Sequence, residues 1–218
     1  MSNLVQLYGP SFSVFVRTAA LVCEEKGIAY QTGKELNGQT IDIHSDKHFQ
    51  LHPFGKMPVL IHGDKILCET ASIGRYLDRI FGPETLQGAT DWERAQIDQW
   101  CSLITQYIDF YVVRQFMLEV VFPKGDNGEP RMDVTSANRP AAENAIAIIA
   151  KQLGSKPFLV GHHFSLADAM LAPMLTYNKD APAPINLVND HPQLLEYTNR
   201  LRARPSGQKV LQPMSKSR

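Results

Sequence analysis

The sequence predicts an α/β domain of order βαβαββα followed by an all-helical domain, and two observations lead to this expectation. Strand-like and helix-like segments alternate up to about residue 82, whereas strand signals vanish after the Gly- and Pro-containing stretch 83–89. A helix between the first two strands implies a parallel pair, and a later hairpin adds antiparallel strands, so the sheet is mixed. We expect domains at 1–82 and 90–218, joined by a linker at 83–89.

The elements of the first domain follow from apolar spacing and from turn residues. Alternation and Gly-Pro punctuation mark strands, helical spacing marks helices, and a Gly just past a helix is a typical C-terminal cap. The hairpin is the clearest unit, because two apolar runs flank a Gly-Asp turn. In order, we expect a strand at 4–8, a helix at 13–26 closed by Gly27, a strand at 28–31, an uncertain helix within the polar stretch up to 47, hairpin strands at 58–62 and 65–68, and a helix at 70–81.

Beyond the linker only helical periodicity remains. A long amphipathic helix is expected first, then a loop rich in Pro and Gly, then three more helices. Pro173 is expected to bend or end the third of these four helices. Ser165 and Asp168 form a variant capping box at its start, so Asp168 is interpreted as structural. The expected ranges are helices at 92–118, 141–153, 166–177 and 193–202, with the loop at 122–130.

Composition is that of an ordinary globular protein. Lys and Arg number 22 against 22 Asp and Glu, so nothing suggests attraction to nucleic acid or an anionic membrane. No signal peptide and no apolar run of spanning length is visible, and three widely spaced cysteines are typical of a reducing compartment. We therefore expect a cytoplasmic protein. No metal is expected, because the seven histidines lack ligand spacing.

Two serines at the start of the first helix, Ser11 and Ser13, are the first candidates for chemistry. A hydroxyl at a strand-to-helix junction lies near free N–H groups, where the helix dipole favours an anion. There it can donate to a thiolate and lower the pKa of the thiol, and only the thiolate is nucleophilic. The alternative is that either serine merely caps the helix.

The segment 52–58, which opens into the hairpin, is the second candidate. If the bond before Pro58 is cis, Met57 can offer its backbone N–H and C=O to an extended peptide, although trans X-Pro bonds are far commoner. Lys56 can supply a cation to a ligand carboxylate. The third candidate is Glu69-Thr70: Thr70 is expected to be the N-cap, with amides that hold a carboxylate, and Glu69 can pair with a ligand ammonium.

A Ser at the first helix start, a Pro opening the third strand and Glu-Thr opening the next helix occur in the order and at about the spacing found in cytosolic glutathione transferases. The sequence resembles this family over nearly its whole length, and its first helix looks like the serine-type, phi/theta-like classes, in a bacterial-type member. The resemblance implies a thioredoxin-like, glutathione-binding first domain. It implies that the all-helical domain forms the site for a hydrophobic co-substrate.

The resemblance also implies roles for individual residues. Ser13 matches the serine that stabilises the thiolate, with Ser11 as a rival. Met57 beside Pro58 would pair with the cysteinyl part of glutathione, Glu69 and Thr70 would hold the γ-glutamyl end, and Lys56 and His44 would meet the glycine carboxylate. The co-substrate wall would include Tyr107, Phe110, Tyr111 and Arg114, with ordinary interdomain core as the alternative for the aromatics. Phe54 would be an aromatic key into a partner subunit, or would be buried in its own.

The expected function is therefore conjugation of glutathione, the co-substrate, to small hydrophobic electrophiles in a cytoplasmic, detoxifying homodimer, without nucleic acid, membrane or metal. Cysteine-based catalysis is disfavoured, because Ser13 stands where thiol-dependent branches carry Cys. Two alternatives remain. One is peroxide or disulfide reduction by glutathione, and the other is a non-catalytic assembly module of this fold, such as the gamma subunit of a translation elongation factor.

Overall fold

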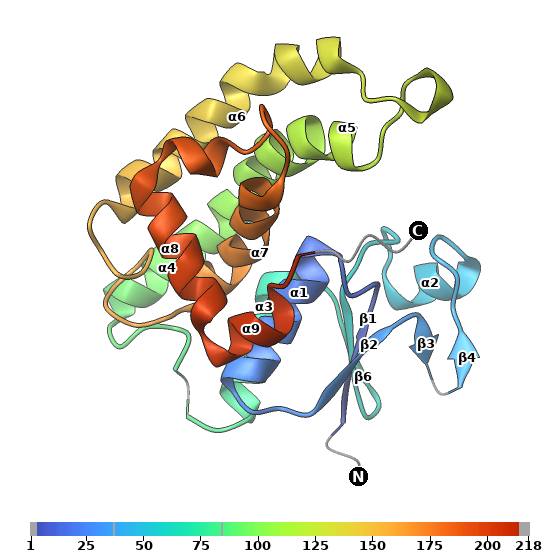
Figure 1. The fold of residues 1–218 in the computed structure, drawn as a ribbon. Coiled ribbons are helices and arrows are strands. Elements are labelled where there is room, and N and C mark those ends of the chain that lie inside the picture. Colours follow the sequence, from blue (N-terminus) through green and yellow to red (C-terminus); the bar gives the residue numbers. More distant parts are fainter. Residues whose placement is uncertain (1–3, 37, 84, 214–218) are drawn as a thin grey trace.

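The computed structural model describes residues 4–36, 38–83 and 85–213, which form a small mixed sheet with flanking helices and a larger helical bundle (Figure 1). Residues 1–3, 37, 84 and 214–218, all of which fall within the expected domain and linker ranges, lie outside the described residues. Among the described residues, no helix combines the length and the apolar character needed to cross a bilayer.

The main sheet has four strands in the order β2-β1-β5-β6. β1 (Val5–Tyr8) runs parallel to β2 (Tyr30–Gly33) and antiparallel to β5 (Val59–His62), which forms a hairpin with β6 (Lys65–Leu67). α1 (Val14–Glu25) is the connection between the parallel strands, as a βαβ unit requires. The expected mixed, thioredoxin-like sheet is confirmed.

The helices of this domain pack on the sheet and on the bundle. α3 (Thr70–Ile80) lies beside α1, and α1 in turn contacts α7 (Leu166–Asp180) of the bundle (Figure 1). Most of α1 from Val16 to Cys23 is buried. Since α1 is covered on the sheet side and on the bundle side, a nearly all-apolar helix is what its position demands.

Two details of the first domain differ from the expected pattern. β2 begins two residues later than expected, because Ile28 is buried in the core before the strand starts. The polar stretch contains a short ladder as well as a helix, since β3 (Glu35–Leu36) pairs with β4 (Gln39–Thr40) ahead of α2 (Asp46–Leu51).

The second part of the chain is all-helical, as expected. Its first long rod is continuous but changes hydrogen-bonding pattern: an α-helical start passes into a π-helix, in which each N–H bonds the carbonyl five residues before it. The elements are α4 (Asp91–Leu103), the π-helix η1 (Ile104–Met117), α5 (Leu118–Val121), a 3₁₀ turn η2 (Asp126–Gly128), α6 (Met132–Leu153), α7 (Leu166–Asp180), a 3₁₀ turn η3 (Leu187–Asp190), α8 (Pro192–Ala203) and α9 (Pro205–Val210).

Prolines are accommodated inside two of these helices. α6 begins nine residues earlier than expected and includes Pro140, whose missing N–H costs one backbone bond but does not end the helix. Pro173 lies inside α7, which continues to Asp180, so of the two expected effects, a bend or an end of the helix, the proline does not end it. Tight packing in the bundle core holds the second helix together, because nearly every residue from Leu166 to Thr176 is buried.

A buried ion pair fixes the chain where the two parts meet. Lys26, at the end of α1, lies 2.9 Å from Asp78 of α3, and both side chains are almost fully buried. The other bonds of this pair go to the linker: Lys26 donates to the carbonyl of Pro83, and the amides of Thr85 and Leu86 donate to the Asp78 carboxylate. A buried charge that is both paired and hydrogen-bonded in this way is compatible with the interior.

Candidate active site

The start of α1 places Ser13 in a cleft with its hydroxyl uncommitted. Gly9 ends β1 with φ +137, and a Cβ there would approach Val16 to 2.6 Å, so only glycine allows this turn. Ser13 is the N-cap of α1, but its side chain makes no capping hydrogen bond. The interpretation of Ser13 as a mere cap therefore loses its main support.

Ser11 is placed differently. It is exposed, and it lines neither of the two cavities that meet at Ser13. Its role in the structure is carried by its carbonyl, which accepts a bond of 3.2 Å from Nε of Arg17. The geometry separates the two serines that sequence reasoning left as rivals.

One crevice of about 460 Å³ brings together residues from five segments of the chain. Besides Ser13, it is lined by every residue expected to bind glutathione: His44, Lys56, Met57, Pro58, Glu69 and Thr70. The Met57–Pro58 peptide bond is cis. Glu69, with φ +68, is the N-cap of α3 and Thr70 is its first helical residue, which corrects the expectation that Thr70 is the cap.

Two histidines without an expected role support this crevice. His48 of α2 is buried; its Nδ1 accepts from the backbone N–H of His44, and its Nε2 lies 3.0 Å from the carbonyl of Lys56. Since Nδ1 accepts, the imidazole proton is on Nε2, which donates to the carbonyl of Lys56. The ring of His48 thus connects the segment of His44 to that of Lys56.

His52 lines the crevice directly. Burial lowers the pKa of His52, its Nδ1 accepts from the N–H of Phe54, and its Nε2 lies 3.9 Å from Oε1 of Glu69. His52 opens the 52–58 segment, six residues before Pro58. This position in the sequence is the one signal that points to a place for His52 in the crevice.

A second cavity of about 680 Å³ adjoins the crevice and is mostly apolar. Its wall from the long rod consists of Asp109, Val113, Arg114 and Met117, together with residues that follow them. Of the four residues expected in the co-substrate wall, Arg114 lines this cavity, whereas Tyr107, Phe110 and Tyr111 do not. Tyr107 is 51% exposed and Phe110 is 42% exposed. The π-helix is the reason, because it rotates the phase of the rod relative to the expected α-helix.

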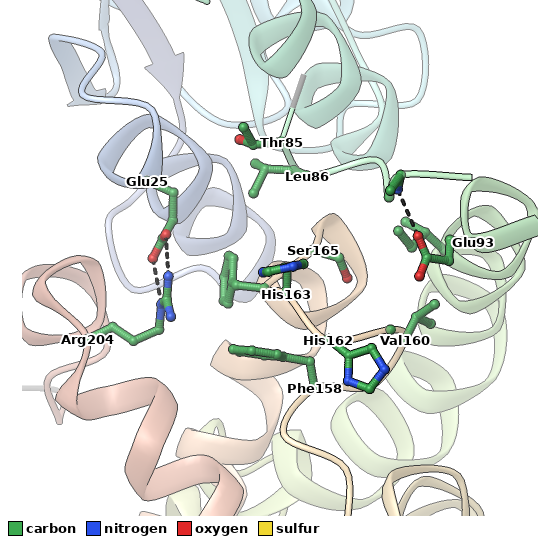
Figure 2. A pocket seen from close by; sticks show the side chains of 15 residues that line it. Glu25, Thr85, Leu86, Glu93, Phe158, Val160, His162, His163, Ser165 and Arg204 are labelled. Carbon is green, nitrogen blue, oxygen red and sulfur yellow. Dashed lines mark hydrogen bonds and ion pairs between the residues drawn. The ribbon is translucent and has the colours of Figure 1, made fainter. Parts of the chain in front are cut away.

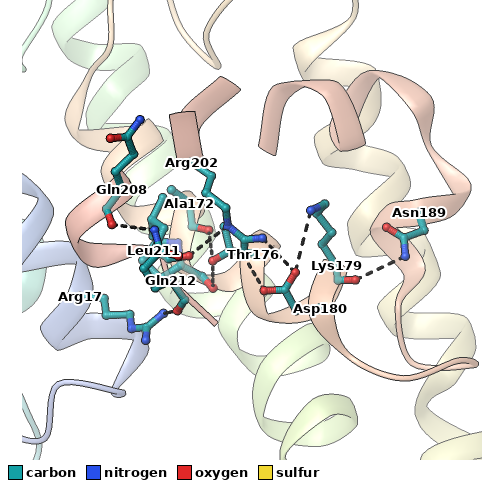
Figure 3. A network of polar contacts seen from close by, with 11 residues as sticks. Arg17, Ala172, Thr176, Lys179, Asp180, Asn189, Arg202, Gln208, Leu211 and Gln212 are labelled. Carbon is teal, nitrogen blue, oxygen red and sulfur yellow. Dashed lines mark hydrogen bonds and ion pairs between the residues drawn. The ribbon is translucent and has the colours of Figure 1, made fainter. Parts of the chain in front are cut away.

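The far wall of the apolar cavity is held by a polar network (Figure 3). Asp180 accepts from the guanidinium of Arg202, which also donates to the carbonyl of Leu211. Arg17 donates to the carbonyl of Gln212 and lies over the ring of Tyr177 at 4.7 Å. These contacts hold α1, the end of α7 and the chain near residue 212 in one arrangement around the cavity.

Comparison with known proteins identifies the family. Residues 7–85 match the family model described as glutathione S-transferase, N-terminal domain, and residues 132–200 match the corresponding C-terminal domain. The chain is 30% identical over 211 residues to glutathione S-transferase 4 of Zea mays, covering 96% of this chain and 93% of that protein. The chain belongs to the glutathione S-transferase family.

Two further similarities extend this result. The theta class glutathione S-transferase from the citrus canker pathogen Xanthomonas axonopodis pv. citri, solved with glutathione bound, is 26% identical, with a TM-score of 0.81 and coverage of 98% of this chain and 99% of that one. A probable elongation factor 1-gamma 1 of Arabidopsis thaliana is 27% identical over 194 residues, covering 81% of this chain but 44% of that protein. The likeness to the elongation factor is therefore confined to part of it.

The cysteines of this glutathione S-transferase are poor nucleophiles. Burial raises the pKa of Cys23 and of Cys101 to about 12 and also raises that of Cys68. None of the three lines the crevice or the apolar cavity. Thiols as hard to ionise as those of Cys23 and Cys101 stay protonated near neutral pH and are poor nucleophiles.

A third cavity, of about 480 Å³, lies away from the cleft, between the linker and the segment before α7 (Figure 2). The Glu25–Arg204 pair lies at one side of it, and His162 and His163 are exposed at its wall. Within the described ranges, no group of three or more His, Cys, Asp or Glu residues is arranged to hold a metal ion. None of the expected site residues lines this cavity.

Proposed function

We propose that this glutathione S-transferase binds glutathione in the crevice beside Met57 and ionises its thiol with the hydroxyl of Ser13. The observation that carries the proposal is the position of Ser13, which lines both cavities at the end of a helix and has no hydrogen bond from its side chain. The hydroxyl and the N-terminal amides of α1 favour an anion at that point. The thiolate then attacks a hydrophobic electrophile held in the apolar cavity.

The charges of the crevice match those of the tripeptide. Glutathione carries an ammonium and a carboxylate at its γ-glutamyl end and a second carboxylate at its glycyl end. Glu69 faces the ammonium, and Thr70 with the first amides of α3 receives the neighbouring carboxylate. Lys56 and His44 receive the glycyl carboxylate, while Met57 pairs its backbone with the cysteinyl unit. Each charge of the ligand thus has a counterpart.

A Ser13→Ala variant tests the proposal. Since it removes one donor aimed at developing negative charge, kcat for conjugation of chlorodinitrobenzene is expected to fall about 100-fold. The pKa of the bound thiol, followed by thiolate absorbance against pH, is expected to rise. The dissociation constant for glutathione is expected to change less than about 3-fold, because binding rests on other residues. An unchanged kcat and thiol pKa would refute the role of Ser13, and Ser11→Ala would be measured next.

Two further measurements on the wild-type protein separate the alternatives. Parallel assays with cumene hydroperoxide and a glutathione-linked disulfide show which acceptor the thiolate prefers. The cleft argues against a non-catalytic module, because a scaffold requires neither an uncommitted Ser13 nor the charged set around Met57. Failure of the wild-type protein to bind a glutathione-agarose column would favour the module instead.

We further propose that the protein is a phi/theta-like, serine-type and bacterial-type member of the family. It acts in the cytoplasm in detoxification, and it does so as a homodimer. Its domains span 1–82 and 90–218, with a linker at 83–89. The likeness to the Xanthomonas theta class protein and the position of Ser13 support the class. Phe54 supports the dimer: it is 76% exposed, which fits an aromatic key seated in a partner subunit and not burial in its own.

The dimer is tested by sedimentation velocity. The wild-type protein is expected to sediment at twice the chain mass of 24.4 kDa, and Phe54→Ala is expected to weaken association at least about 10-fold, since buried aromatic anchors commonly contribute 2 kcal/mol or more. Ile148→Ala is the matched control, because Ile148 is also an exposed apolar residue but lies on α6. A wild-type protein that sediments as a monomer at micromolar concentration would contradict the proposal.

A further inference from the structure

The crevice and the apolar cavity share a border that contains a charged pair. Six residues line both spaces: Ser13, Phe15, Ile43, Met57, Asp109 and Arg114. Four of these come from the first domain, and the pair Asp109–Arg114 comes from η1. The pair therefore stands at the junction where a thiolate held at Ser13 meets its electrophile.

The π-helix is what joins the two charged residues. Five positions separate them, and in a helix with i→i+5 hydrogen bonds residues five apart lie nearly above one another. In an α-helix the neighbours on one face are three and four apart, so this pair would diverge. Nε of Arg114 donates a short hydrogen bond to Oδ2 of Asp109.

The surroundings of the pair determine what it can do. Asp109 is 4% exposed, and burial raises its pKa, an effect that Arg114 offsets only in part. Arg114 is its one hydrogen-bond partner among the described residues. A buried carboxylate without a partner is costly, so Asp109 holds the guanidinium in place. The two terminal nitrogens of Arg114 have no partner among the described residues and can donate to a ligand.

Arg114 is the one cationic side chain among the described residues that line the apolar cavity. The charged side chains that line this space, within the described chain, are Asp109, Arg114 and Asp180, and Asp180 is occupied by Arg202. The side chain of Arg114 is 49% exposed, so its two free nitrogens are open to an incoming ligand, and a guanidinium binds a carboxylate in bidentate fashion. A neutral electrophile gains no such contact.

We propose that Arg114, held by Asp109 through the π-helical register, is a specificity-determining residue that selects hydrophobic electrophiles bearing a carboxylate. This inference rests on the proposed transferase function and adds the class of co-substrate to it. The glycyl carboxylate of glutathione is not the occupant we assign, because Lys56 and His44 are placed for it.

Two matched electrophiles test the proposal: 4-chloro-3-nitrobenzoate and 4-chloro-3-nitrobenzamide. In each reaction the glutathione thiolate forms a C–S bond at the chlorine-bearing carbon, the C–Cl bond breaks and chloride leaves, while the thiol proton passes to solvent. The readout is the ratio of kcat/KM for the benzoate to that for the benzamide. Arg114→Gln is expected to lower this ratio at least about 10-fold relative to wild type, as expected for loss of hydrogen bonds between charged groups.

Two further variants sharpen the result. Asp109→Asn leaves Arg114 charged but removes the carboxylate that holds it, so the ratio is expected to fall several-fold. Arg94→Gln is the control, because Arg94 lies near the start of α4 and lines neither space of the cleft; its ratio is expected to equal that of wild type. An unchanged ratio in Arg114→Gln overturns the proposal, and an unchanged ratio in Asp109→Asn overturns the role of the π-helical pair.

Binding distinguishes failure of this inference from failure of the transferase function. Titration calorimetry with the two finished glutathione conjugates is expected to show tighter binding of the carboxylate conjugate to wild type and loss of that preference in Arg114→Gln. If wild type turns over neither electrophile but keeps the preference, the transferase function is wrong and the selection by Arg114 holds. If wild type binds both conjugates equally, the selection is wrong whatever the turnover.

Discussion

Ser13 and Asp168 are both polar residues at the start of a helix, and the fold uses them in opposite ways. The hydroxyl of Ser13 makes no bond within the described protein and faces the cleft, whereas the carboxylate of Asp168 is fully buried and fully used. Asp168 accepts from the amides of Leu159 and Ser165, from the hydroxyl of Ser165 and from the hydroxyl of Tyr197. The interpretation of Asp168 as a structural residue agrees with these bonds.

The Asp168 contacts give a prediction for stability. Asp168→Ala leaves four buried donors without their acceptor, so the free energy of unfolding is expected to fall by about 3–5 kcal/mol. Urea denaturation measures the change. Asp91→Ala is the control: Asp91 is an exposed residue in the first turn of α4, and its loss is expected to cost less than about 1 kcal/mol. A loss below about 1 kcal/mol for Asp168→Ala would show that water replaces the carboxylate.

At the scale of the element, the sequence predicts those segments whose apolar spacing or turn residues leave one solution. β1, α1, the β5–β6 hairpin and α3 lie within two residues of their expected bounds for this reason. The short ladder at 35–40 was missed because each of its strands has only two residues, too few for any periodicity.

α9 was missed because its composition argues against a helix. It has six residues, too few for a clear period, and it contains Gly207, a poor helix former in the interior of a helix. The structure explains the glycine: a Cβ there would lie 2.1 Å from the carbonyl oxygen of Leu201. Close approach between α8 and α9 therefore overrides local propensity, and this is information that a single sequence does not contain.

The site shows the same division. Residues on short, strongly marked segments, such as Ser13, Met57 and Glu69, were predicted and do lie in one crevice. The residues that line the apolar cavity are harder to predict. Which residues of a helix face a cavity depends on the hydrogen-bonding register of the helix, and no residue pattern in 104–117 indicates a π-helix. In the π-helical register, Val113 and Met117 line the apolar cavity, whereas Tyr107 and Phe110 do not.

At the scale of the whole molecule, one carboxylate at the end of α1 joins the first part of the chain to its last helices. Glu25 accepts two bonds from Arg204, at 2.9 and 2.7 Å (Figure 2). It also accepts one from the hydroxyl of Ser206. Burial alone raises the pKa of Glu25, but these hydrogen bonds and the charge of Arg204 outweigh it, so its pKa lies below the ordinary 4.5.

This pair gives a prediction for pH dependence. Because the pKa of Glu25 is lower in the folded than in the unfolded protein, its ionised form stabilises the fold above about pH 4.5, and this contribution is lost as pH falls through the folded-state pKa. Glu25→Gln is expected to lower the free energy of unfolding by about 1–2 kcal/mol at pH 7, allowing for partial exposure.

The difference between wild type and Glu25→Gln is therefore expected to shrink as pH falls below about 4.5. Urea denaturation from pH 7 to pH 3 measures it. Glu196→Gln serves as the control, because Glu196 pairs with Arg200 on the exposed face of α8. A difference that stays constant across this range would mean that the charge of Glu25 does not contribute.

The Lys26–Asp78 pair bears on how such proteins can be recombined. Since Lys26 binds Pro83, and Asp78 binds Thr85 and Leu86, the connecting segment is fastened to the sheet domain rather than free to swing. A chimera can join the sheet domain of one relative to the helical domain of another. The junction belongs after Leu86, so that Lys26, Asp78 and their partners in the linker all come from one parent. After a cut near Gly82, Lys26 and Asp78 would still pair with each other, but their partners in the linker, the carbonyl of Pro83 and the amides of Thr85 and Leu86, would come from the other parent.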